Sequence, residues 1–145
     1  MEPTVTSPIP VLGMHHVALN CGDLAAQERF YCELLGFRRV AVFRQGTPKE
    51  FIMLQLGASY LELFPRRVPG GEGGGGEQAI GFKHMAFEVG NLDDAMGALA
   101  RRELVVDATY DWSEIMPGFR LCFFRDPEGN IVELLEGFRA ESGGK

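Results

Sequence analysis

Two segments of the sequence repeat one pattern, and this internal repeat restricts the fold more than any other feature. The segment HHVALNCGDLAAQERFYCELLGF (15–37) aligns without a gap with KHMAFEVGNLDDAMGALARRELV (83–105), at an offset of 68 positions. Farther along, SYLELF (59–64) resembles NIVELL (130–135) at an offset of 71. A repeat of this kind indicates that both copies fold as the same supersecondary unit.

Each copy reads as a strand, a helix and then further strands. The short apolar runs HHVAL and HMAFEV predict the first strands. Asp23 and Asn91 are expected to cap the following helices, because their side chains accept hydrogen bonds from backbone N–H groups of the first turn. The turn residues in GAS (57–59) and DPEGN (126–130) predict hairpins between later strands. The sequence therefore predicts an α+β fold built from two tandem βαβββ units.

Segments of a different composition flank and join the two copies. PRRVPGGEGGGGEQ (65–78) is so rich in Gly and Pro that helix or strand there would carry a high entropic cost. The chain ends are expected to be loose. The predicted organisation is a flexible segment at 1–12, one domain at 13–138 with repeats at about 13–64 and 81–136, a linker at 65–80, and a tail at 139–145.

Composition and charge exclude several classes of partner. The formal net charge of -6 argues against nucleic acid, whose binders gather Lys and Arg on one face. The sequence contains no apolar stretch of the roughly 18 residues that a membrane span needs, and the N-terminal segment lacks the pattern of a secretion signal. The three cysteines form no CxxC pair, and we expect them to be small buried apolar residues. These features predict a soluble cytoplasmic protein that binds a small molecule.

Strand alternation places four ionisable residues on equivalent faces. Side chains alternate between the two faces of a strand, and the aliphatic set of each strand should cover the helix. His16 and His84 in the first strands, and Glu62 and Glu133 in the last, therefore point away from the helices. Because a buried charge is costly unless it is paired or bound to a metal, matched positions predict a common partner. His15 is expected to pack or hydrogen-bond on the helix side.

Two imidazoles and two carboxylates form a mixed nitrogen and oxygen ligand set. Such a set suits one divalent transition-metal ion, here Ni, Zn, Co, Mn or Fe, with water at the open positions. Ligation without thiolates disfavours a closed structural zinc site and leaves room for a substrate. The alternative interpretation is that each His is a core histidine and each Glu is an edge charge.

The segments that carry these residues resemble those of a known group. HHVALNCGDLAAQERFYCELLGF, YLELF, GFKHMAFEV and FFRDPEGNIVELLEGF are each similar to segments of the vicinal oxygen chelate superfamily, the glyoxalase, bleomycin-resistance and dioxygenase group. The resemblance spans about residues 12–138. It implies that the two units form a cupped mixed sheet around a central cleft, with one metal ion held by His16, Glu62, His84 and Glu133. It also implies a homodimer.

The resemblance further implies a lyase or isomerase of the glyoxalase I type. A divalent ion that binds two oxygens of a small oxygenated substrate stabilises an enediolate-like intermediate and so favours proton loss at the adjacent carbon. By resemblance, Glu133 is expected to be the catalytic base and Glu62 a ligand, and the reverse assignment stays open. The Arg and Asn residues with which glyoxalase I holds glutathione find no match here. The alternatives are an epimerase or dioxygenase of the same superfamily, or a metal-free protein that sequesters a small molecule.

Several other side chains are candidates for substrate contacts. Arg66 and Arg67 precede the glycine-rich segment and could clamp an anionic group. Solvated surface charge is the simpler interpretation for them, for Arg38–Arg39 and for Arg101–Arg102. The aromatic residues expected to wall the pocket are Tyr60, Phe64, Trp112 and Phe119.

Overall fold

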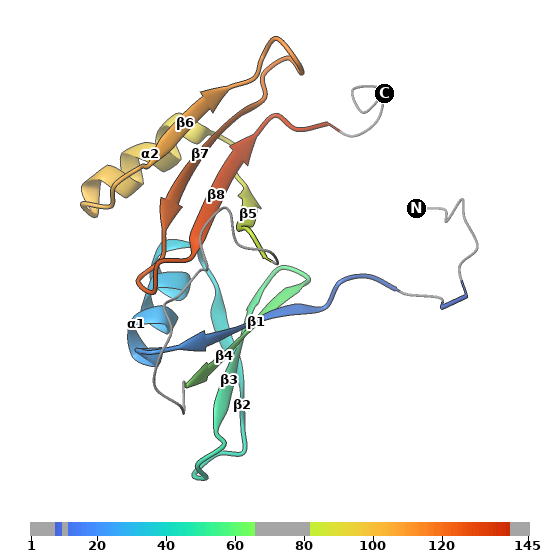
Figure 1. Ribbon diagram of the computed structural model, residues 1–145, viewed down its shortest axis with the longest axis vertical. Helices are drawn as coiled ribbons and strands as arrows, with labels where there is room; N and C mark the ends of the chain where they lie inside the picture. Colours follow the sequence, from blue (N-terminus) through green and yellow to red (C-terminus); the bar gives the residue numbers. More distant parts are fainter. Residues whose placement is uncertain (1–7, 10–11, 66–81, 140–145) are drawn as a thin grey trace.

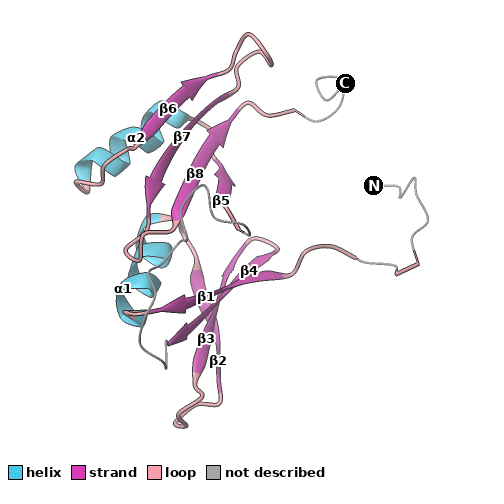
Figure 2. Cartoon of the chain, viewed as in Figure 1, coloured by secondary structure: helices cyan, strands magenta, loops and turns pink. Residues whose placement is uncertain are grey.

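Two similar units, each a four-stranded mixed sheet with a helix against it, make up the computed structural model (Figures 1 and 2). The structure describes residues 8–9, 12–65 and 82–139. The predicted linker lies outside these residues except for Pro65, as do most of the predicted N-terminal segment and tail. The first unit contains β1 (His16–Cys21), α1 (Leu24–Arg29), the π-helical segment η1 (Phe30–Leu34), β2 (Arg38–Phe43), β3 (Phe51–Leu56) and β4 (Ser59–Pro65); the second contains β5 (Met85–Glu88), α2 (Leu92–Arg101), β6 (Ala108–Asp111), β7 (Arg120–Arg125) and β8 (Ile131–Glu136).

Both helices begin at the predicted capping residues. The Asp23 carboxylate accepts a hydrogen bond from the Ala26 backbone N–H at 3.0 Å, and the Asn91 side chain accepts one from Asp94 at 3.0 Å. α1 continues into η1 and the chain turns at Gly36, whose φ of 84° lies in the region that glycine adopts without strain. The predicted caps are therefore confirmed.

The strands follow the same order in both units. The first sheet has the order β1-β4-β3-β2 and the second β5-β8-β7-β6. In each sheet the first strand pairs in parallel with the last, and the remaining pairs are antiparallel. The β3–β4 hairpin turns at Gly57, with φ of 58°, and the β7–β8 hairpin turns at residues 126–130. The tandem βαβββ prediction is confirmed, with the described strands in two sheets of four.

The helix-facing sides of the sheets form the hydrophobic core. In the first unit Leu61 and Leu63 of β4 are buried in one cluster with Tyr31 of η1. In the second, Val132 and Leu134 of β8 are buried in a cluster with two leucines of α2. Glu62 of β4 and Glu133 of β8 stand between these residues in the sequence and point to the opposite faces.

The two units of the chain contact each other through this core side. The rings of Phe37 and Phe87 meet edge to face at 5.9 Å. Nearby, the buried carboxylate of Asp126 accepts hydrogen bonds from the Tyr31 hydroxyl at 2.7 Å and from the Gln27 amide at 3.1 Å. Helix α1 is thereby tied to the β7–β8 turn, which lies beside it in Figure 1.

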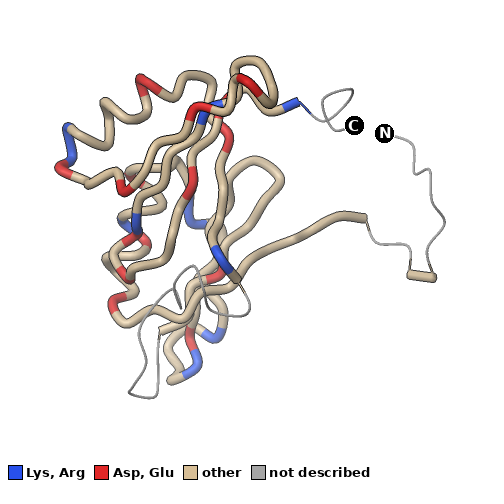
Figure 3. Tube along the Cα trace, turned by 45° about the horizontal axis from the view of Figure 1, so that its top comes forward, with Lys and Arg blue, Asp and Glu red and all other residues tan. Residues whose placement is uncertain are grey.

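The charged residues are spread over the molecule rather than gathered by sign on one face. Basic and acidic residues are intermixed over the described part of the chain (Figure 3). None of the described helices has the length and apolar character to cross a bilayer.

Cys21 and Cys122 are buried as expected, whereas Cys32 is half-buried, and all three are free thiols. Burial raises the pKa of the Cys21 thiol to about 12, so it stays protonated at neutral pH.

Candidate metal centre

Each sheet carries one histidine–glutamate pair on the face that points away from its helix, which we call the site face. In the first sheet, His16 Nε2 lies 3.2 Å from Glu62 Oε1. In the second, His84 Nε2 lies 2.9 Å from Glu133 Oε1. The parallel registers pair Ala18 with Glu62 and Ala86 with Glu133. Each histidine stands two residues before that alanine, His16 as the first residue of β1 and His84 immediately before β5, so each lies diagonally beside its glutamate. The four residues thus lie on the faces that strand alternation predicts, and the pairing of each histidine with the glutamate of its own unit is a finding of the structure.

Both carboxylates are more enclosed than their histidines. The Glu133 side chain is 9% exposed and the Glu62 side chain 14%, against 26% for His84 and 38% for His16. In the neighbouring strands, the residue in register with Glu62 is Met53, and the residue in register with Glu133 is Phe123 of β7. An apolar neighbour thus stands at the same position in both units.

The structure brings the four predicted ligands together as two pairs. Among the described residues, no three His, Cys, Asp or Glu side chains lie close enough together to hold a metal ion. A cleft of about 680 Å³ separates the first strands of the two units. His16 and His84 both line this cleft, whereas Glu62 and Glu133 do not. Each unit of the chain therefore presents half of the predicted site.

His15 does not pack on the helix side, and that prediction is wrong. Its ring stacks on Tyr60 with 4.6 Å between centroids, and its Nδ1 lies 2.9 Å from Nδ1 of His16. His15 precedes β1, so its side chain is free to turn towards Tyr60 while its carbonyl accepts a hydrogen bond from the Tyr60 N–H. The neighbour of a predicted ligand thus belongs to the site.

Cross-strand register arranges the first site face in three rows. The middle row contains Glu62 and Met53 between two alanines. On one side of it lies a row of stacked phenylalanines, with ring centroids 4.9 Å and 4.2 Å apart. On the other side lies a polar row. The polar row is Arg38, Gln55, Tyr60 and His16; the middle row is Ala41, Met53, Glu62 and Ala18; the aromatic row is Phe43, Phe51, Phe64 and Asn20.

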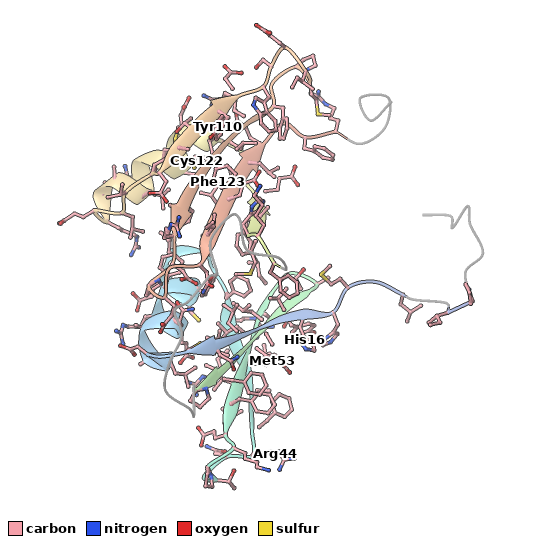
Figure 4. The ribbon with its side chains drawn as sticks, viewed as in Figure 1. His16, Arg44, Met53, Tyr110, Cys122 and Phe123 are labelled. Carbon is pink, nitrogen blue, oxygen red and sulfur yellow. The ribbon has the colours of Figure 1, made fainter. Side chains whose placement is uncertain are left out.

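A chain of aromatic rings leads away from His84 across the second site face. Phe123 meets the His84 ring edge to face at 5.3 Å, and Tyr110 of β6 lies next, 6.1 Å from Phe123. Figure 4 shows Phe123 and Tyr110 on the upper sheet and His16 and Met53 on the lower one. The chain continues from Tyr110 through Trp112, Phe119 and Phe138.

The four predicted pocket aromatics therefore divide between the two units. Tyr60 lines the cleft, and Phe64 belongs to the aromatic row of the first site face. Trp112 and Phe119 extend the ring chain that begins at His84. Met53 and Phe123 were not among the predicted site residues, although alternation along β3 and β7 would have placed both on the site faces.

The donor atoms fit a divalent transition metal. Imidazole nitrogen and carboxylate oxygen are both suitable ligands for such ions, and each pair offers one of each at hydrogen-bonding distance. Two such pairs supply four ligands and leave positions open for a substrate. The chemistry fits, provided that the two site faces are brought opposite each other.

Comparison with known proteins identifies the family. Residues 13–134 match the family model of the Glyoxalase/Bleomycin resistance protein/Dioxygenase superfamily. The chain belongs to this superfamily. All four predicted ligands lie within the matched residues. The superfamily is the group that the sequence segments resemble.

The similarity to individual relatives extends over most of this chain and nearly all of each relative. The protein YwkD of Bacillus subtilis (strain 168) is 32% identical over 125 residues, which are 85% of this chain and 95% of YwkD. A glyoxalase family protein from Enterococcus faecalis is 29% identical, with a TM-score of 0.70 over 86% of this chain and 98% of that one. A lactoylglutathione lyase from Agrobacterium tumefaciens is 26% identical, with a TM-score of 0.64 over 89% and 96% of the two chains.

Proposed function

We propose that the protein is a metal-dependent lyase or isomerase of the glyoxalase type that acts on a small oxygenated substrate. The observation that carries this proposal is the recurrence of one histidine–glutamate pair on the site face of both units. A single pair could be a surface contact. Two pairs at equivalent positions, each with an enclosed carboxylate, supply the ligands of one divalent ion.

The divided ligand set leads us to infer a homodimer in which the first unit of one chain faces the second unit of its partner. A two-fold axis would then assemble two complete sites, each with His16 and Glu62 from one chain and His84 and Glu133 from the other. β1 and β5 stand at sheet edges, where strands are open to pairing with another chain. Exposed apolar side chains beside both strands support this arrangement, since Met14 before β1 is 85% exposed and Phe82 before β5 is 91% exposed.

The proposed chemistry is proton transfer between neighbouring carbons. A divalent ion bound at the site would hold two substrate oxygens and stabilise the negative charge that develops on them. Glu133, the more enclosed carboxylate, is assigned to remove the proton and deliver it to the adjacent atom. Glu62 is assigned as a ligand. The apolar neighbours Met53 and Phe123 limit the access of water to both carboxylates.

The relatives support this class of reaction without fixing the substrate. The Agrobacterium tumefaciens neighbour is named a lactoylglutathione lyase, at 26% identity. An epimerase, a dioxygenase or a metal-free sequestering protein are the alternatives within the superfamily. Oxygen uptake with Fe(II) would favour a dioxygenase, and ligand binding by metal-stripped protein would favour sequestration.

Metal content per chain tests the proposal. The stripped protein is reconstituted with Ni, Co, Zn, Mn or Fe and analysed for bound metal, beside His16→Ala and His84→Ala. We expect about one equivalent per chain in the parent protein and a large loss in both variants. Loaded protein is then screened with hemithioacetals, acyl-CoA thioesters and catechols. Failure to bind any of these metals would contradict the proposal.

A further inference from the structure

Two adjacent arginines at the start of β2 point to opposite faces of the first sheet. Arg39 points to the helix side, where its guanidinium donates two hydrogen bonds to the Glu28 carboxylate at 2.7 Å and 2.6 Å. Arg38 points to the site face, where it donates to the Gln55 side chain at 3.3 Å. Within the described part of the chain, Arg38 contacts no carboxylate. Arg39 is therefore a structural cation, whereas the charge of Arg38 is available.

Hydrogen bonds hold the acceptor of Arg38 in place. The Gln55 amide donates to the Gly57 carbonyl at 2.9 Å and to the Tyr60 hydroxyl at 3.3 Å. With its NH₂ group engaged on that side, the Gln55 amide presents its oxygen to Arg38. Tyr60 in turn stacks on His15 beside the predicted ligand His16. One polar row thus connects the guanidinium to the proposed metal site.

Arg38 is the single Lys or Arg whose side chain lies on the site face of the four strands of the first sheet. β2 lies two strand spacings from β4, which carries Glu62, so these two strands stand roughly 10 Å apart. On the other side of Glu62 the row is aromatic. The two sides of the site face therefore differ in polarity.

We propose that Arg38, held by Gln55, binds an anionic group of the substrate, a carboxylate or a phosphate, about two strand spacings from the reacting oxygens. A guanidinium suits this role because its planar fork matches both oxyanions. The chain as a whole is acidic, with a net charge of -6. A single available cation on this face would therefore favour substrates that carry an anionic group beside Arg38. The inference rests on the proposed function, and it makes Arg38 a determinant of substrate specificity.

Hydroxamates of graded length test this role, because they bind divalent ions through two oxygens and can carry a second group at the far end. The Co(II)-loaded protein is titrated with acetohydroxamate and with hydroxamates that end in a carboxylate or a phosphonate on chains of increasing length. We expect the best anionic probe to bind about tenfold more tightly than acetohydroxamate. In Arg38→Gln this advantage should disappear while the affinity for acetohydroxamate stays the same.

Further variants separate the guanidinium from charge in general. Arg38→Lys keeps the charge without the fork and should retain part of the advantage. Arg102→Gln changes an exposed arginine at the end of α2 and should retain all of it. The tail that depends on Arg38 identifies the anion as a carboxylate or a phosphate.

The outcomes distinguish this inference from the function on which it rests. Binding of acetohydroxamate with no advantage for either anionic tail, or with an advantage that survives Arg38→Gln, overturns the role of Arg38 alone. Absence of all hydroxamate binding overturns the proposed metal-dependent function, and the role of Arg38 with it.

Discussion

The Nδ1 atoms of His15 and His16 lie 2.9 Å apart, so a hydrogen bond between the rings needs the proton on one of them. His16 directs its other nitrogen, Nε2, towards Glu62. A histidine that binds a metal through Nε2 carries its proton on Nδ1 and usually donates it to an acceptor that fixes the ring. His15 is in position to be that acceptor.

Replacement of His15 should weaken metal binding without unfolding the protein. His15→Phe preserves an aromatic ring against Tyr60 but removes the acceptor, and we expect a loss of roughly tenfold or more in metal affinity. His15→Asn retains an acceptor and should recover part of the loss. Competition with a chelating dye measures both affinities. Equal affinities in the parent protein and His15→Phe would show that His15 does not orient His16.

The two glutamates should differ in their effect on turnover. In Glu133→Gln the amide cannot take up a proton, so turnover should fall by about 100-fold or more while the metal is retained. Glu62→Gln should reduce turnover less if Glu62 acts as a ligand alone. Glu88→Gln, an exposed change on β5, serves as the control. Full activity in Glu133→Gln would exclude it as the base.

Loss of the Tyr31 hydroxyl should destabilise the contact between the two units. The hydroxyl donates a hydrogen bond to Asp126, which is only 4% exposed. Tyr31→Phe leaves this buried carboxylate with one hydrogen-bond donor fewer. We expect the free energy of unfolding to fall by about 1–3 kcal/mol in urea titrations at pH 7. Tyr110→Phe, at a half-exposed tyrosine, is the control and should change stability little. Equal stability of Tyr31→Phe and the parent protein would contradict this account.

The same tyrosine should make stability fall in alkaline solution. Burial, and then the Asp126 charge, raise the pKa of Tyr31 well above its usual range. The folded phenol therefore stays neutral while the unfolded phenol ionises above about pH 10, its ordinary pKa. Stability is retained below that pH and is lost as the pH rises further. Urea titrations across this range should show that the free energy of unfolding of Tyr31→Phe falls less steeply with pH than that of the parent protein. The same dependence on pH in both proteins would refute the assignment.

Gly137 should tolerate alanine less well than Gly57 does. Both adopt positive φ, at 82° and 58°, where a side chain is strained. A Cβ at Gly57 would meet open space, whereas one at Gly137 would run into the Gly118 carbonyl. Thermal unfolding should show Gly137→Ala to be less stable than Gly57→Ala by about 1–3 kcal/mol. Equal midpoints would mean that the chain after β8 can move aside at little cost.

Local chemistry explains which parts of this structure could be predicted from the sequence. Asp23 and Asn91 cap their helices, and His16 and Glu62 share a face, because caps and strand alternation depend on neighbouring residues. Alternation fails along β2, where the register shifts between Arg39 and Ala41 and an extra residue interrupts the ladder. The positions of Phe43 and Ala41 on the site face therefore could not be read from the sequence.

Contacts across sheets were also beyond prediction from one sequence. Strand alternation assigns a face to His16 and His84 but does not bring the two faces together. The two units are joined by the packing of α1 and η1 against the β7–β8 turn, through the hydrogen bonds of Gln27 and Tyr31 to Asp126. That packing joins residues nearly a hundred positions apart, for which the sequence offers no periodic signal.

Complementation between two defective chains tests the central claim most directly. One chain carries His16→Ala and Glu62→Ala, and the other carries His84→Ala and Glu133→Ala. A homodimer of either variant therefore contains no complete site. In a mixed dimer, the intact first unit of one chain would meet the intact second unit of its partner and restore one site of two. We expect about half an equivalent of metal per chain in the isolated mixed dimer. Metal content that stays near zero would contradict a site shared between two chains.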